Sequence, residues 1–403
     1  MGQSVNKAWG DDVFPFLSWF ETQKVKDAKV MVVGVGALGN EVLKNLALFG
    51  VGNLVIVDFD TIEYGNLTRS ALFRPEDADK GLYKADVAAR RINEINPDIH
   101  VIPVCGDLST GAGLGLYRRM DVVIGCLDNL QARISLNRNC FRAGKPWIDG
   151  AIGDLEGQVS VYQAGTNCYE CNLTDDERQA LFRRTSCAEV VKMNEQAGRT
   201  ATTPVIASLI GAVQVQEAMK YLHPEAIEAD VFTTLAGKLL VYEGKRLAVG
   251  IYDFSSLQND CIAHENWNPV IEIPELSADT TIGQAFEYIS RHCGEIEINM
   301  RNDRFVDRIV SRSDNKQFSP MLPQSKIPAY ILADEALRNR QIAEGFYQHA
   351  FENIDASFPY PSLTLRQIGI PCLDVIQVST PKGLFYVELS KDLEKYETHP
   401  AYC

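Results

Sequence analysis

The sequence has few basic residues relative to acidic ones. Its 403 residues include 39 lysines and arginines against 53 aspartates and glutamates, which leaves a formal net charge of −14 at pH 7. A surface of this sign repels a phosphate backbone, so the composition argues against general nucleic-acid binding. A small anion can still bind such a protein where a few cations converge locally.

Long apolar runs are also missing. No stretch approaches the roughly 20 residues that a membrane-spanning helix needs, and the first residues lack the basic-then-apolar order of a secretory signal. We therefore expect a soluble, cytoplasmic protein with no membrane partner. In that compartment, ten cysteines favour free thiols, metal ligands or a nucleophile over disulfides.

One stretch near the N-terminus has the order strand, glycine-rich turn, helix, strand. Its first strand, Val30–Val33, is a short β-branched run typical of a parallel sheet covered on both faces. Gly34, Gly36 and Gly39 would let the chain turn tightly, approach a phosphate and pack a helix on its strand. The second strand ends at Asp58, which is placed to accept hydrogen bonds from a ribose. The stretch therefore predicts a Rossmann-like nucleotide-binding unit.

Two further motifs specify the kind of nucleotide site. The chain reads Asp58-Phe59-Asp60 and then Asn66-Leu67-Thr68-Arg69. Together these motifs resemble the D-x-D…N-L-x-R signature of the activating enzymes of ubiquitin-like proteins, which include the ThiF/MoeB family. The resemblance implies a site that binds ATP and adenylates the C-terminal glycine of a small protein. It places Asp58, Asp60, Asn66 and Arg69 at the nucleotide.

The same resemblance implies a phosphate-binding lysine and a magnesium ligand. Lys84, near the start of a helix expected at 81–97, matches the family's lysine best, with Lys80 as the alternative and a solvated lysine as the ordinary interpretation of either. Asp128 follows another buried strand, at the edge where open α/β sheets bind ligands, and corresponds to the family's Mg²⁺ ligand. The lysine and Arg69 would neutralise charge on the β- and γ-phosphates as pyrophosphate leaves.

Four metal-type ligands occur in two pairs far apart in the sequence. Cys168 and Cys171 form a C-x-x-C knuckle, and Cys261 and His264 form a C-x-x-H pair. Three thiolates and an imidazole suit a tetrahedral structural Zn²⁺ site. The alternative is two unrelated cysteine pairs and a solvated histidine. Members of the family usually close this site with a second C-x-x-C, so His264 is a conservative departure.

The segment 172–203, between the two pairs, is charged and contains Cys187 just after Arg183 and Arg184. Adjacent arginines favour the thiolate, which is the form that attacks an acyl adenylate. The resemblance makes this segment the family's crossing loop and Cys187 the catalytic cysteine that accepts the activated C-terminus as a thioester. In the alternative interpretation this cysteine is dispensable, because the enzyme stops at adenylation.

The composition changes after residue 268. A strand at 270–274, an amphipathic helix at 282–292 and a hairpin within 375–389 follow in the order of a β-grasp fold. This part resembles the ubiquitin-fold domain with which eukaryotic activating enzymes recruit a conjugating enzyme.

We therefore predict an α/β protein in two parts. Residues 1–268 form a Rossmann-like adenylation domain with a mostly parallel sheet, the crossing loop and the zinc knuckle. Residues 269–403 form a smaller α+β domain of the β-grasp (ubiquitin-fold) type. An insertion at about 313–360, with a helical piece expected around 332–351, has no counterpart in the resemblance.

The expected function is ATP- and Mg²⁺-dependent activation of a ubiquitin-like protein that ends in glycine, with thioester formation and transfer to a ubiquitin-conjugating-type enzyme. The architecture resembles activators of bacterial ubiquitin-like conjugation operons, some of them antiphage systems. One alternative is adenylation of a sulfur-carrier protein for thiamine, molybdopterin or tRNA thiolation. Another is a non-catalytic nucleotide-binding scaffold.

Relatives of this kind lead us to expect a homodimer. Family members often carry an N-terminal arginine that reaches the partner subunit's ATP, but no arginine precedes Arg69 in this chain. That contact is therefore absent here or is made by Lys7, Lys24 or another group.

Overall fold

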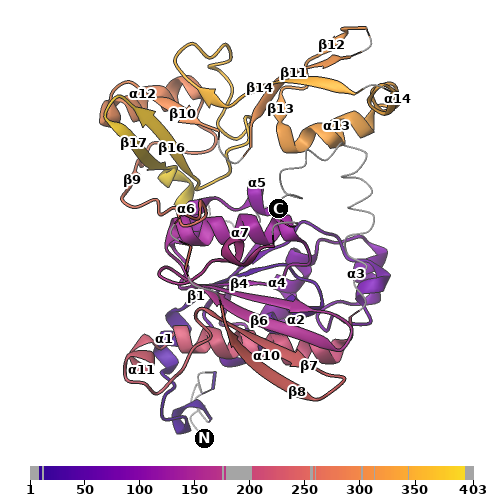
Figure 1. The fold of residues 1–403 in the computed structure, drawn as a ribbon, viewed down its shortest axis with the longest axis vertical. Helices are drawn as coiled ribbons and strands as arrows, with labels where there is room; N and C mark the ends of the chain where they lie inside the picture. Colours follow the sequence, from indigo (N-terminus) through magenta and orange to yellow (C-terminus); the bar gives the residue numbers. More distant parts are fainter. Residues whose placement is uncertain are drawn as a thin grey trace, which may run out of the picture.

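The computed structural model describes residues 9–10, 13–174, 177, 202–254, 257–258, 260–300, 303–312, 314–343 and 345–394. Within these residues the chain forms one eight-stranded sheet and two smaller sheets of five and four strands. Figure 1 shows the large sheet in the lower part of the molecule and the two smaller sheets side by side above it.

The eight-stranded sheet has the strand order β3-β2-β1-β4-β5-β6-β7-β8. The pairings from β3 to β5 are parallel, and those from β5 to β8 are antiparallel. This mostly parallel, Rossmann-like sheet confirms the predicted fold class. The strands are β1 Lys29–Val33, β2 Asn53–Val57, β3 His100–Val104, β4 Val122–Gly125, β5 Trp147–Ile152, β6 Glu156–Tyr162, β7 Lys238–Glu243 and β8 Ala248–Asp253.

Successive residues of the central strands alternate between two hydrophobic cores, because side chains of a strand point to opposite faces. Val30 and Val32 of β1 lie in one core with residues of α2, α4 and α10, whereas Met31 and Val33 lie in the other with residues of α5, α6 and α7. Figure 1 shows α7 and α10 on opposite sides of the sheet. The helices are α1 Thr22–Asp27, α2 Ala37–Phe49, α3 Pro75–Asp79, α4 Lys84–Ile95, α5 Leu108–Gly111, α6 Leu114–Arg118, α7 Leu130–Ala143, α10 Pro204–Tyr221 and α11 Pro224–Glu228.

The five-stranded sheet has the order β15-β10-β16-β17-β9, with β9 parallel to β17 and the other pairings antiparallel. With helix α12 (Ile282–Cys293) it forms the predicted β-grasp part. Asn299, Gln377 and Tyr386 are paired across three neighbouring strands and so share one face of this sheet. Its strands are β9 Val270–Glu272, β10 Glu297–Asn299, β15 Asn353–Ile354, β16 Val375–Thr380 and β17 Gly383–Glu388.

The third sheet belongs to the inserted region, where the prediction of a helical piece around 332–351 is half wrong. Helix α14 (Glu335–Ala343) is followed by Gly345, which has a φ of +77°, and then by strand β14 (Phe346–Phe351) paired with β11. Residues 346–351 form a strand because they pair with β11, which is distant in the sequence. The other elements here are β11 Phe305–Ser311, β12 Gln317–Phe318, β13 Leu322–Pro323 and α13 Ile327–Ala333.

The β-grasp part packs directly on the large sheet's domain at α6. An added Cβ on Gly115 would lie 2.4 Å from the carbonyl oxygen of Leu373, so the two backbones touch. The backbone N–H of Leu114 donates to Asp374 at 2.8 Å. Glu388, fully buried, is paired with both Arg118 and Arg119. Hydrophobic residues of both parts belong to one continuous core.

The structure also bears on membrane insertion. Over the part of the chain that it describes, every helix is too short or too polar to cross a membrane.

Candidate nucleotide and metal sites

The glycine turn after β1 brings three pieces of backbone into contact. An added Cβ on Gly34, whose φ is +90°, would lie 2.4 Å from the carbonyl oxygen of Cys126, just after β4. A Cβ on Gly39 would lie 2.0 Å from the carbonyl oxygen of Gly34. Gly36, the N-cap of α2, has only open space on its Cβ side and no capping side chain. No side chain caps the first backbone N–H groups of α2, and their role in binding a phosphate stays a prediction.

Asp58 follows β2 and reaches back to this turn. Its carboxylate accepts hydrogen bonds from the backbone N–H of Val35 at 2.6 Å and of Asp60 at 2.8 Å. Burial raises its pKa to about 6, and the nearby charge of Lys84 opposes that rise. The structure therefore places Asp58 beside the glycine turn, where a bound ribose was predicted.

Lys84 and Asp60 meet at the same edge of the sheet. The ammonium group of Lys84, at the first position of α4, lies 2.7 Å from a carboxylate oxygen of Asp60. The side chain of Lys84 is only 10% exposed, whereas Lys80 is exposed. A cation held in place by a carboxylate is better positioned for a phosphate than a solvated one. The geometry therefore favours Lys84 over Lys80.

Asn66 and Arg69 lie on the segment between β2 and α3. The side chain of Asn66 accepts from the backbone N–H of Glu63 at 2.9 Å, and Arg69 donates to the carbonyl of Gly65 at 3.3 Å. Both residues are half-buried. Their recorded contacts are local, so their roles at a nucleotide stay predictions.

Asp128 is exposed at the carboxyl end of β4, the strand that pairs with β1. It comes two residues after Cys126, whose carbonyl touches the glycine turn. The neighbouring Asn129 caps α7 by accepting from the backbone N–H of Ala132 at 2.8 Å. An exposed carboxylate at this edge of the sheet suits a Mg²⁺ ion on phosphates, and this role of Asp128 stays a prediction.

Two buried polar groups that hold these loops were not predicted as site residues. Asn40 donates to the carbonyls of Val35 and Gly36, both at 2.9 Å, and accepts from the backbone N–H of Leu72 at 2.9 Å. It therefore ties the glycine turn to the chain just beyond Arg69. Its position right after the last glycine of the turn is the signal that could have identified it.

The second group is an ion pair beneath the Asp128 loop. Arg133 of α7 lies 3.2 Å from Asp149 of β5 and donates to the carbonyl of Leu127 at 2.6 Å. The carbonyl of Leu127 directly precedes Asp128, so this arginine fixes the loop. Asp149, a charged residue within an otherwise apolar strand, was the available sequence signal.

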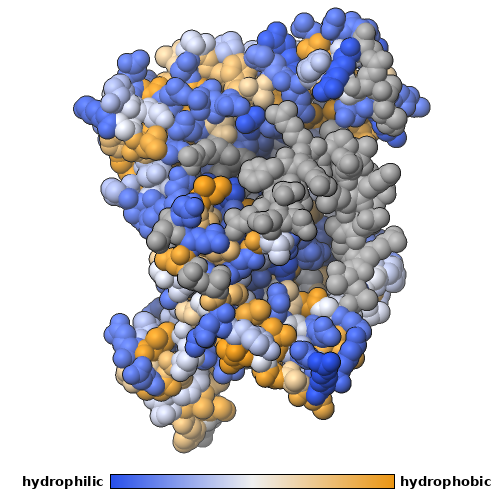
Figure 2. All heavy atoms as spheres, viewed as in Figure 1, coloured by the Kyte–Doolittle hydropathy of each residue, from blue (hydrophilic) through white to orange (hydrophobic). Residues whose placement is uncertain are grey.

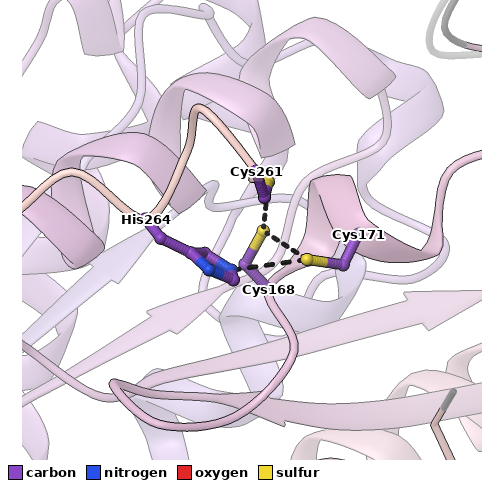
Figure 3. Close-up of side chains that lie close together, drawn as sticks. All are labelled: Cys168, Cys171, Cys261 and His264. Carbon is purple, nitrogen blue, oxygen red and sulfur yellow. Dashed lines mark hydrogen bonds between the residues drawn. The ribbon is translucent and has the colours of Figure 1, made fainter. Parts of the chain in front are cut away.

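The four predicted metal ligands converge, as Figure 3 shows. Their ligand atoms all lie within 4.8 Å of one another, although the two pairs are some ninety residues apart. The sulfur of Cys168 lies 3.6 Å from that of Cys171 and 3.7 Å from that of Cys261, and Nε2 of His264 lies 3.3 Å from the sulfur of Cys171.

These distances fit zinc. Four ligands at Zn–S distances of about 2.3 Å in a tetrahedron have sulfurs roughly 3.8 Å apart. The ring of His264 stacks on Phe141, with centroids 5.0 Å apart, and this contact sets its orientation. Glu170, between the two cysteines of the knuckle, accepts hydrogen bonds from Nε and Nη2 of Arg138 at 2.9 and 2.7 Å. The geometry is compatible with a closed structural zinc site and contradicts unrelated pairs.

Cys187 lies outside the described residues, as does most of the predicted crossing loop at 172–203. Its role as a nucleophile therefore stays a prediction. The described ends of this segment directly follow the Cys168–Cys171 knuckle on one side and directly precede α10 on the other.

The chain is similar to several known proteins over part of its length. The profile of the ThiF family matches residues 8–262, more than half of the chain. The chain is 35% identical over 223 residues to an Escherichia coli K12 protein named molybdopterin-synthase adenylyltransferase, which covers 55% of this chain and 81% of that protein. It is 38% identical over 150 residues to SUMO-activating enzyme subunit 2 of Dictyostelium discoideum, which covers 37% of this chain and 22% of that protein. Among solved structures, E. coli MccB with ATP has a TM-score of 0.48 at 22% identity, and covers 60% of this chain and 68% of that one.

The metal site gives the first testable prediction. The purified chain should hold about one equivalent of zinc, and Cys261→Ser should lose it and melt roughly 10 °C lower, because the ligand bonds stabilise only the folded chain. His264→Cys should keep the metal, since four thiolates also suit zinc. Elemental analysis and thermal melts check both variants. Equal metal content in wild type and Cys261→Ser would contradict the site.

Asp58 gives a second prediction, on pH. A carboxyl whose pKa is raised by folding, here to about 6 from an ordinary 3.8, stabilises the fold at low pH and loses that contribution as the pH rises through 6. Asparagine does not titrate. The unfolding free energy of wild type relative to Asp58→Asn should therefore fall between about pH 4 and 6 and level off above about pH 7. Guanidinium unfolding curves at several pH values measure this difference in unfolding free energy. If the difference between wild type and Asp58→Asn grew with pH, the raised pKa would be refuted.

Proposed function

The chain belongs to the ThiF family, and on that premise we propose that it adenylates the C-terminal glycine of a ubiquitin-like protein. Cys187 then takes the acyl group as a thioester and passes it to a conjugating enzyme. The observation that carries the adenylation step is the Lys84–Asp60 pair, 2.7 Å apart, at the sheet edge beside the glycine turn. A buried cation at this position is suited to the phosphates of ATP.

In this proposal, each residue at this edge of the sheet binds a different part of ATP. The turn at Gly34, Gly36 and Gly39 admits the phosphates to backbone N–H groups, and Asp58 accepts from the ribose. Asp60, Asn66, Arg69 and Lys84 surround the phosphate chain. Asp128 would hold Mg²⁺, which neutralises the phosphates when bound.

In the first reaction, the carboxylate of the partner's last glycine attacks the α-phosphorus of ATP. A carboxylate–phosphorus bond forms, the bond to the bridging oxygen breaks, and pyrophosphate leaves with both electrons of that bond. Lys84 and Arg69 stabilise the charge that develops on the leaving group. In the second reaction, the Cys187 thiolate attacks the acyl carbon and AMP leaves.

Sulfur-carrier activation is the second candidate function. A specific observation favours it, because a relative named molybdopterin-synthase adenylyltransferase is 35% identical over 223 residues. Sulfur-carrier activation would use every adenylation residue named above, and its reaction differs from the first candidate only after the acyl adenylate forms. The β-grasp part supports the first candidate instead, since a sulfur-carrier activator has no need to recruit a conjugating enzyme. A non-catalytic scaffold has the least support.

An apolar surface on the last two strands of the large sheet supports a protein partner. Val249 and Ile251 share one face of β8, Leu247 directly precedes the strand, and these three residues are between 59% and 82% exposed. In Figure 2, hydrophobic residues occur among hydrophilic ones in the lower part of the molecule, where Figure 1 shows β7 and β8. Exposed apolar patches commonly mark protein interfaces. We assign this surface to the ubiquitin-like partner or to the second subunit of a homodimer, in a bacterial conjugation system of the antiphage type.

The nucleotide site has a matched pair of lysines for its test. Lys84→Ala should weaken binding of Mg²⁺ and a non-hydrolysable ATP analogue by at least about 30-fold, because it removes a buried phosphate contact. Lys80→Ala should change it by less than about twofold, since an exposed lysine contributes little. Calorimetric titration of both variants compares them directly. Equal losses, or a loss in Lys80→Ala alone, would move the phosphate contact away from Lys84.

The thioester step needs its own test. With a glycine-ended small protein that supports ATP–pyrophosphate exchange in the wild type as substrate, Cys187→Ala should keep that exchange but lose the adduct that thiols cleave, because only the second reaction uses the cysteine. Cys293→Ala, in α12, is the control and should keep both. Non-reducing gels and labelled pyrophosphate measure the two steps. An adduct that survives in Cys187→Ala would assign the nucleophile elsewhere.

A further inference from the structure

Helix α7 joins the two candidate sites of the large domain. Asp128, the predicted Mg²⁺ ligand, lies two residues before its start, and side chains of its second half contact the residues around the metal cluster. Since an α-helix rises about 1.5 Å per residue, the first residue of α7 and Asn137 are roughly 10 Å apart along the axis. The helix therefore connects two sites that different segments of the chain build.

The C-x-x-C knuckle is fastened to α7 by Glu170. This residue lies between the two cysteines and is 5% exposed. Its carboxylate accepts from Nε and Nη2 of Arg138 at 2.9 and 2.7 Å, and from the side-chain amide of Asn137 at 3.3 Å. Asn137 in turn accepts from the backbone N–H of Tyr169 at 3.0 Å. Paired hydrogen bonds between a guanidinium and a carboxylate are directional, so they fix the knuckle at one place on the helix.

The C-x-x-H pair contacts the last turn of the same helix. The ring of His264 stacks on Phe141, with centroids 5.0 Å apart. Nε of Arg142 lies 3.5 Å from the carboxylate of Glu265. The carbonyl of Arg142 also accepts from the backbone N–H of Trp267 at 3.1 Å. Both pairs of the metal cluster drawn in Figure 3 therefore rest on α7.

The first turn of α7 sets the position of the Asp128 loop. Arg133 donates to the carbonyl of Leu127 at 2.6 Å and to that of Gly150 at 3.2 Å. Asn129 is the N-cap of α7, and its side chain accepts from a backbone N–H of the first turn. Asp128 thus lies between Leu127 and Asn129, which are both held by the helix.

The carboxylate of Asp128 depends on this support. It is exposed, and it accepts from the side chain of its neighbour Asn129 at 3.3 Å. A contact with the next residue does not fix where the loop lies, so the helix must do so. Mg²⁺ demands near-ideal octahedral geometry, and a site that is loose by about 1 Å loses much of its function.

We propose that Glu170 is a positioning residue for the nucleotide site. It locks the metal knuckle to α7, and α7 holds Asp128 where a Mg²⁺ ion on ATP needs a ligand. The inference rests on the proposed adenylation, because it concerns the Mg²⁺ of that site. It makes occupation of the metal cluster and binding of Mg²⁺–ATP reciprocal, so that each strengthens the other through a rigid helix.

Calorimetric titration of the full chain with a non-hydrolysable ATP analogue, with and without Mg²⁺, measures the gain in affinity that Mg²⁺ provides. Glu170→Ala leaves all four metal ligands in place, and the partly exposed Arg138 can turn to solvent. The variant should keep its zinc but lose at least about tenfold of the Mg²⁺ gain, as is usual when a group that orients metal ligands is removed. Its affinity without Mg²⁺ should change by less than about twofold, because α7 carries neither the glycine turn nor Lys84.

Two further variants separate positioning from general stability. Glu170→Gln should restore the gain to within about threefold of wild type, since an amide oxygen still accepts from Arg138. Glu217→Ala is the matched control, because Glu217 is also a buried glutamate, 2% exposed, and is paired with Lys220 of α10. It should lower the melting temperature and leave the Mg²⁺ gain unchanged. Cys261→Ser, which lacks a metal ligand, should lose the gain as Glu170→Ala does.

The inference is overturned if Glu170→Ala keeps the wild-type Mg²⁺ gain, or if Glu217→Ala loses as much of it. It is also overturned if Glu170→Ala loses its zinc, because the residue would then act on the metal and not on the helix. Failure of the proposed function has a different signature. A wild-type chain that does not bind the analogue would contradict adenylation itself, and this inference with it.

Discussion

The close approach of backbone at the glycine turn is the constraint on which the nucleotide edge depends. Gly34 lies against the carbonyl of Cys126 and Gly39 against the carbonyl of Gly34, at separations that no Cβ tolerates. Strands β1 and β4 and helix α2 are thereby fixed to one another. Asp58 hydrogen-bonds back to this turn, and Asp128 follows the strand that touches it. A side chain at either glycine would force these elements apart and displace both carboxylates.

Buried polar contacts then hold in place the loops that follow these strands. Asn40 ties the glycine turn to the chain after Arg69, and the Arg133–Asp149 pair supports the Asp128 loop from below. Buried ion pairs contribute little net stability compared with apolar side chains, because desolvation offsets their attraction. Their value here is geometric, since they allow one arrangement of loops that carry functional groups.

The contact between the β-grasp part and the large domain also depends on close backbone packing and on buried charged groups. Gly115 allows backbone contact with Leu373, and the fully buried Glu388 is paired with two arginines of the large domain. The hydrophobic core runs through this contact without a break. The β-grasp part is therefore held in one orientation relative to the adenylation edge. On the proposed function, a conjugating enzyme bound to this part would be presented at a fixed position.

The sequence by itself determined those features that depend on local spacing. The β-branched run, the glycines after it and the acid that ends the next strand predicted the Rossmann-like unit, because strand period, turn geometry and helix start are short-range properties. The two cysteine pairs predicted a metal site by their chemistry. The strand, helix and hairpin of residues 270–389 likewise predicted the β-grasp part.

Only the tertiary structure decided what depends on distant contacts. Lys84 was preferred to Lys80 on resemblance alone until its pairing with Asp60 distinguished them physically. Folding brings His264 within 3.3 Å of Cys171, which groups it with the three cysteines and contradicts a solvated side chain. The segment 346–351 is a strand because β11 lies beside it. These contacts are set by strand register and domain packing. Both depend on residues far apart in the chain, so a short stretch of sequence cannot predict them.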